Sequence, residues 1–121
     1  MSKERVAEEY GIATVRALED FLVHADQAQA AIRSKVDVDH YPAELAAEAL
    51  AVRLGESLNR ASRAYVAARR TVGLEQIIAT RNVVAHGYDI VDHDLLWRYF
   101  SRDLPAAVAV VRQDLEVPNK P

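Results

Sequence analysis

Apolar positions repeat with the period of an α-helix along most of the chain and predict long helices. Glycine and proline are few, and the stretches between them are rich in Ala, Leu, Glu and Arg, which are strong helix formers. Over residues 13–34 the apolar side chains lie three or four positions apart, with charged residues between them. We predict an amphipathic helix there, with an extra N-terminal turn before Gly11. Its apolar positions are Val15, Leu18, Leu22 and Ala25.

Two further helices follow after connections marked by turn-forming residues. Residues 37–42 combine two aspartates with a proline, which suits a loop and places Pro42 in the first turn of a second helix over 42–68. A short connection over 68–73 precedes a third helix from Leu74 to His86. Gly87 can end this helix in the left-handed conformation.

The last helical stretch begins with Asp92 as a predicted N-cap and runs to about Leu115, with Pro105 bending or restarting it. No segment shows the strict alternation of a half-buried strand. We therefore predict an all-α fold, a four-to-five-helix up-down bundle in one domain over residues 1–121, with 116–121 as a frayed tail.

Composition narrows the classes of function. With no cysteine among 121 residues, disulfides, thiolate nucleophiles and cysteine-bound zinc are excluded, and a reducing cytoplasm is the expected location. The charged N-terminus and the lack of a long apolar run predict neither export nor a membrane span. The 15 basic and 18 acidic residues give a net charge of -3, so any contact with nucleic acid must be local.

On the third helix, Arg81 falls near the middle of an apolar stripe and needs an anionic partner. If Arg81 is considered alone, the Glu56 carboxylate in a structural ion pair and a phosphate supplied by a ligand are equally good partners. Asn82 and His86 lie four positions apart on a neighbouring flank, close enough for the amide to orient the imidazole. The stripe consists of Leu74, Ile77, Ile78, Val84 and Ala85.

His86 stands at the end of the same helix, where the macrodipole favours the protonated imidazole. Considered alone, a histidine before a helix-ending glycine is more often a cap or a packed residue than a catalyst. The long side chain of Arg81 can converge with His86 on one small anion. Together they suit phosphodiester chemistry.

The octapeptide from Arg81 to Tyr88, Arg-Asn-x-x-Ala-His-Gly-Tyr, resembles the signature of the HEPN superfamily, specifically the HepT-like toxins. The likeness covers about the second half of the chain. It implies a HEPN-like helical bundle, a homodimer whose two motifs face one cleft, and metal-independent endoribonuclease activity with no cofactor. Such a protein is the toxin of a toxin–antitoxin pair of type II or VII.

The resemblance also implies roles for the motif residues. Arg81 and His86 would be catalytic in the attack of an RNA 2′-hydroxyl on the adjacent phosphate, and Asn82 would position His86 or the phosphate. Tyr88 resembles the tyrosine that a partner nucleotidyltransferase antitoxin of the MNT type modifies with adenylate. The alternative for Tyr88 is an ordinary tyrosine that packs past the helix end.

Four arginines lie within about a third of the circumference of the predicted second helix and are candidates for RNA contact, although a solvated arginine face is the simpler reading. The candidates are Arg53, Arg60, Arg63 and Arg70. His24, His40 and His93 have no ligand spacing, so no metal site is predicted.

Three hypotheses remain open from the sequence: a ribonuclease toxin, a non-catalytic HEPN-like module that binds a nucleotide or a partner through Arg81, and a helical dimer in which Arg81 and Glu56 form a structural ion pair. A fully buried Arg81–Glu56 pair with no cleft beside it would favour the third.

Overall fold

The structure, a computed structural model, describes the backbone of residues 2–35, 40–69, 72–85 and 93–116, and within these ranges the side chains of 32–35, 40–47, 93–95 and 97 are left undescribed. This part of the chain forms seven helices and no strand, which confirms the all-α prediction. None of these helices combines the length and apolar character needed to cross a bilayer. The helices are α1 (Lys3–Tyr10), α2 (Ile12–Lys35), α3 (His40–Asn59), α4 (Arg63–Ala68), α5 (Leu74–Ala85), α6 (His93–Arg102) and α7 (Leu104–Leu115).

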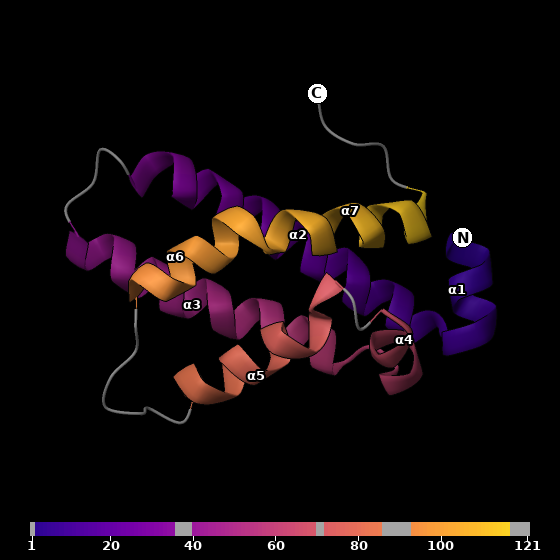
Figure 1. The fold of residues 1–121 in the computed structure, drawn as a ribbon. Coiled ribbons are helices and arrows are strands. Elements are labelled where there is room, and N and C mark those ends of the chain that lie inside the picture. The colour runs from indigo at the N-terminus through magenta and orange to yellow at the C-terminus, as the bar shows by residue number, and fades with distance from the viewer. Residues whose placement is uncertain (1, 36–39, 70–71, 86–92, 117–121) are drawn as a thin grey trace.

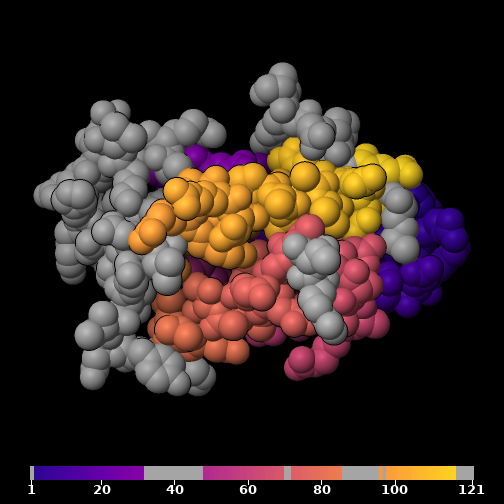
Figure 2. Space-filling view, viewed as in Figure 1, coloured from indigo at the N-terminus to yellow at the C-terminus, as the bar shows by residue number. Residues whose placement is uncertain are grey.

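The long helices α2 and α3 form the centre of the bundle. α3 packs against α2 on one side and α5 on the other, and α6 and α7 also contact α2 (Figure 1). α5 and the consecutive helices α6 and α7 together cover one face of the molecule (Figure 2). The core between the helices holds fully buried side chains from every layer, including Phe21, Leu54, Ile77, Phe100 and Leu104.

The predicted first helix is confirmed, and its expected N-terminal extension is a separate helix. Gly11 has a φ of 95°, a conformation that L side chains rarely adopt, and its N–H donates to the Ala7 carbonyl at 2.9 Å to end α1. Ser2 caps the start of α1 by accepting a hydrogen bond from the Arg5 N–H at 3.3 Å. α1 therefore turns back to pack on α2 and α7 (Figure 1).

The prediction of one helix over 42–68 is wrong, because the chain leaves the helical path after Asn59. The N–H groups of Arg60 and Ala61 bond three residues back, to Ser57 and Leu58, as in a tightened last turn. The next backbone donor, the Ser62 N–H, bonds instead to the hydroxyl of buried Thr14 at 2.9 Å. A new helix, α4, starts at Arg63.

The last two helices confirm the expected effect of Pro105. α6 ends at Arg102, the Asp103 N–H donates to the Tyr99 carbonyl at 2.9 Å, and α7 restarts with Pro105 in its first turn. The predicted N-cap Asp92 and helix terminator Gly87 lie outside the described residues.

A polar cluster of Tyr10, Tyr65, Arg69 and Asp114 joins α1, α4 and α7. The Tyr65 hydroxyl donates to Asp114 Oδ2 at 2.5 Å, and Arg69 Nε donates to the same oxygen at 2.5 Å. The Arg69 guanidinium also lies 3.9 Å from the centroid of the Tyr65 ring. Burial, followed by the Asp114 carboxylate, raises the pKa of Tyr65.

Candidate functional site

The position of Arg81 is set by a close approach between α3 and α5. A Cβ atom added at Gly55 would lie 2.1 Å from Arg81 Cβ and 3.1 Å from the Ile77 carbonyl oxygen. Only a residue without a side chain fits between the two helices at this point. The aliphatic stem of Arg81 consequently rests directly against the α3 backbone, and its guanidinium emerges at the α3 side of α5.

Arg81 is neither buried nor free, and its guanidinium is incompletely bonded. Nη1 donates to Asn82 Oδ1 at 3.0 Å, and Nη2 reaches Glu56 Oε1 at 3.5 Å. Nε is buried without a hydrogen-bond partner among the described residues. The side chain is 27% exposed. The exposed part of the guanidinium, held by Asn82 and only loosely paired with Glu56, is suited to receive an anionic ligand.

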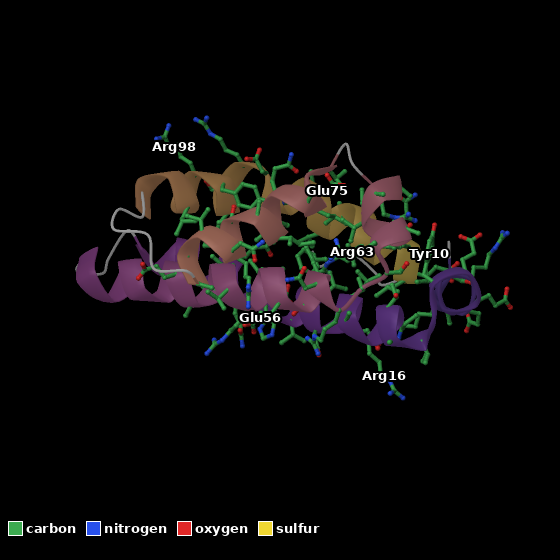
Figure 3. The ribbon with its side chains drawn as sticks, turned by 90° about the horizontal axis from the view of Figure 1, so that it is seen from below. Tyr10, Arg16, Glu56, Arg63, Glu75 and Arg98 are labelled. Carbon is green, nitrogen blue, oxygen red and sulfur yellow. The ribbon has the colours of Figure 1, made fainter. Side chains whose placement is uncertain are left out.

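The contact with Glu56 is a weak ion pair and not the fully buried pair that would have favoured a purely structural role. Its 3.5 Å separation is long, and the Glu56 side chain is 53% exposed, so water competes for the carboxylate. Figure 3 shows Glu56 on the outer side of α3. The carboxylate can therefore move aside when another anion approaches Arg81.

A pocket of about 370 Å³ opens beside Arg81, between α2, α3 and α5. Among the described residues that line it, three are arginines and Glu56 is the one acidic residue. Arg60 forms an ion pair with Asp20 at 3.0 Å, with both side chains more than half exposed. The residues that line the pocket are His24, Arg53, Glu56, Ser57, Asn59, Arg60 and Arg81.

The break after Asn59 divides the arginines that were predicted to share one helix face. Arg53 and Arg60 line the pocket beside Arg81, whereas Arg63 stands on α4 and lines a different pocket together with Asn82. Figure 3 shows Arg63 well separated from Glu56. The prediction that these arginines share one face of a single helix is therefore wrong, because that helix ends at Asn59, before Arg63. Arg70 lies outside the described residues.

Of the predicted motif residues, Arg81 and Asn82 are among the described side chains. Asn82 contacts Arg81, a contact that the sequence analysis did not anticipate. His86 and Tyr88 lie outside the described residues, so their predicted roles stay predictions. Along the described ranges, no three His, Asp or Glu side chains are gathered in a metal-binding arrangement.

Two contributors to the site were missed by sequence reasoning. Gly55 breaks an otherwise favourable helix pattern, and an isolated glycine inside a helix is a usable signal of close packing. His24 belongs to α2, and nothing local in the sequence connects it with Arg81. Only the packing of α2 on α3 brings its imidazole to the same pocket.

Comparison with known proteins identifies one family. The model of the family described as Ribonuclease HepT-like matches residues 12–113. This range includes α2 to α6 and nearly all of α7, together with every residue that lines the two pockets beside Arg81 and Asn82. No curated protein and no solved structure matches the chain.

Proposed function

This chain belongs to the HepT-like ribonuclease family, and we propose that it is a metal-independent endoribonuclease toxin whose catalytic residues are Arg81 and His86. One observation carries the proposal within the fold. Arg81 is fixed by the close approach of α3 and α5 and supported by Asn82, and its partly exposed guanidinium, with only a long contact to Glu56, lines a pocket together with two more arginines. A guanidinium in this state is prepared to bind a phosphate.

The proposed reaction is transesterification within RNA. The 2′-hydroxyl next to the scissile phosphate loses its proton and attacks phosphorus, the bond to the 5′-oxygen of the next nucleotide breaks, and that oxygen gains a proton. His86 moves the proton as general base or acid, and Arg81 stabilises the charge on the phosphoryl oxygens. The products are a 2′,3′-cyclic phosphate and a 5′-hydroxyl.

Asn82 acts in this scheme as a positioning residue. Its amide oxygen accepts a hydrogen bond from Arg81 Nη1 at 3.0 Å, which limits the rotation of the guanidinium. The amide nitrogen remains available for His86 or a phosphate oxygen, as the family resemblance implies. Substitution of Asn82 is therefore expected to weaken catalysis without removing a reacting group.

The acidic chain and the family resemblance both favour a homodimer as the active form. The net charge is -3, so one protomer offers little long-range attraction to RNA. Two protomers with their motifs in a shared cleft would double the local positive charge. A mass measurement in solution, such as sedimentation equilibrium, would contradict this part of the proposal if the active protein were a monomer.

We further propose that Tyr88 is the point of control. A nucleotidyltransferase antitoxin of the MNT type would transfer adenylate from ATP to its hydroxyl with release of pyrophosphate, adding bulk and negative charge next to the cleft and repelling RNA. Mass spectrometry of the Tyr88 peptide after co-expression with such a partner tests this claim. A fully neutralised toxin with unmodified Tyr88 would disprove it.

A second candidate function is a non-catalytic module that holds a nucleotide or a protein partner through Arg81. The basic pocket favours it to the extent that anion binding requires no catalysis. The two functions differ in one measurable property, since only the first makes new RNA ends.

The test compares the wild-type protein with Arg81→Ala and His86→Ala on a labelled RNA, with Arg16→Ala as a control that removes an exposed arginine from α2 (Figure 3). We expect the rate to fall by about 10²–10⁴-fold in both motif variants and to stay unchanged in the control. Circular dichroism checks that all variants are folded.

If the wild type cuts no RNA, or if His86→Ala cuts as well as wild type, the catalytic assignment is wrong. Nucleotide binding that disappears in Arg81→Ala without any cleavage by the wild type would establish the second candidate function instead.

A further inference from the structure

The pocket beside Arg81 has more positive groups than one scissile phosphate requires. Arg81 alone can contact the reacting phosphate, yet Arg53 of α3, Arg60 directly after the end of α3 and His24 of α2 line the same space of about 370 Å³. Among the described lining residues Glu56 is the one acidic group, and it is more than half exposed and already paired with Arg81. The wall of the pocket therefore carries an excess of positive charge although the chain as a whole is acidic.

The individual partners of these groups leave donors available for a ligand. Arg53 is exposed and has no ion-pair partner among the described residues. Arg60 is held by Asp20, but this pair is exposed at both ends and exchanges easily with another anion. His24 contacts Gln27 Oε1 through Nδ1 at 3.2 Å, and its imidazole forms the α2 side of the pocket, so the donors available to a ligand are those of the two arginines.

Ser57 and Asn59 complete the lining with neutral polar groups. The Ser57 hydroxyl donates to the Arg53 carbonyl at 3.0 Å and keeps its oxygen as a possible acceptor only. The strong donors are thus concentrated on the arginines. Guanidinium groups prefer carboxylate and phosphate, and an RNA chain bound at Arg81 presents phosphates on both sides of the scissile one.

We infer that the pocket between α2, α3 and α5 is a second phosphate-binding subsite, in which Arg53 and Arg60 hold a phosphate of the RNA backbone next to the one bound by Arg81. The inference rests on the proposed ribonuclease function for its choice of ligand. Arg63 does not belong to this subsite, since it lines the separate pocket beside Asn82. The subsite fixes the register of the strand without reading its bases.

The subsite is tested with short substrates that differ by one phosphate. A dinucleoside monophosphate carries the scissile phosphate alone, and the same compound with an added 5′- or 3′-terminal phosphate also has a group for the subsite. For the wild-type protein, one of the two added phosphates should lower KM about tenfold with kcat little changed. In Arg53→Gln this advantage should disappear, and Arg53→Lys should restore part of it.

Binding of a longer oligonucleotide tests the subsite without relying on cleavage. A 2′-deoxy substitution at the scissile nucleotide blocks the reaction, and the dissociation constant is measured against salt concentration. Loss of one phosphate contact in Arg53→Gln should reduce the magnitude of the slope of log K against log salt by about 0.7. Arg16→Gln, which makes the same charge change on an exposed part of α2, should leave the slope as in the wild type.

The two proposals fail in different ways. If the wild type binds the blocked RNA with an Arg53-dependent slope but cuts nothing, the subsite stands and the ribonuclease proposal fails. If the wild type cuts RNA and Arg53→Gln has the same KM, phosphate preference and slope, the subsite is wrong. It is also wrong if the wild type does not bind RNA, or if Arg53 affects only the binding of inorganic phosphate, which would identify a site for the free ion.

Discussion

At the scale of single residues, the chemistry of Arg81 depends on the missing side chain of Gly55. The sequence correctly places Arg81 on the inward face of its helix and names Glu56 as a partner to consider. It cannot show that the guanidinium stays 27% exposed beside a pocket, because that outcome depends on how closely α3 and α5 approach. The separation of two helices distant in sequence is a property of tertiary packing.

The first prediction concerns Gly55→Ala. On an exposed helix this change normally stabilises by about 1 kcal/mol, because alanine is the better helix former. Here the new methyl group would lie 2.1 Å from Arg81 Cβ, so α5 must move away from α3. We expect the free energy of unfolding, measured by urea denaturation, to fall by about 1–3 kcal/mol.

A double-mutant cycle with Arg81→Gly provides the control, because this second change removes the Cβ atom that the new methyl meets. The loss caused by Gly55→Ala should be smaller in the Arg81→Gly background. A gain in stability from Gly55→Ala in the wild-type background would mean that the helices are not in contact at this point.

At the scale of elements, the sequence predicts helices well and one of their boundaries poorly. The starts and restarts that local chemistry controls, at Gly11 and Pro105, are found where expected. The break after Asn59 is different, since apolar residues continue at helical spacing through Tyr65. It is stabilised by Thr14, a residue 48 positions away, whose hydroxyl receives the Ser62 N–H. No local pattern contains that partner.

The second prediction tests this long-range cap through Thr14→Val. Valine fills the same space but cannot accept from the Ser62 N–H at 2.9 Å or donate to the Tyr10 carbonyl at 2.9 Å. Because Thr14 is only 2% exposed, water cannot replace either bond, and we expect a loss of about 1–3 kcal/mol in the free energy of unfolding.

Thr80→Val is the matched control, since the Thr80 hydroxyl bonds only to the Gln76 carbonyl within its own helix. It should cost well under 1 kcal/mol. Hydrogen exchange should also be faster at the Ser62 amide in Thr14→Val. Equal stabilities for the two variants would show that Thr14 does not hold the α3–α4 turn.

At the scale of the whole molecule, the buried ionisable groups make stability depend on pH in the alkaline range. The hydroxyl of Tyr65 of α4 donates to Asp114 of α7, and Tyr99 of α6 has a buried hydroxyl with no hydrogen-bond partner among the described residues. Burial raises the pKa of both tyrosines, and the carboxylates of Asp114 and Asp103, respectively, raise it further. In both cases the folded protein holds the proton more tightly than the unfolded chain does.

The third prediction is therefore a loss of stability as the pH rises above about 10, the ordinary pKa of tyrosine. Beyond that pH the unfolded chain releases protons that the folded protein retains, so the free energy of unfolding falls, by about 1.4 kcal/mol per pH unit for each tyrosine. Tyr99→Phe should reduce the steepness of this fall by the contribution of one tyrosine. It should change the free energy of unfolding little at pH 7, because the Tyr99 hydroxyl makes no hydrogen bond among the described residues. Urea denaturation between pH 7 and 12 measures both effects. A free energy of unfolding that stays level above pH 10, or an unchanged slope in Tyr99→Phe, would mean that these hydroxyls are open to water and that the packing of α6 and α4 on the core is looser than described.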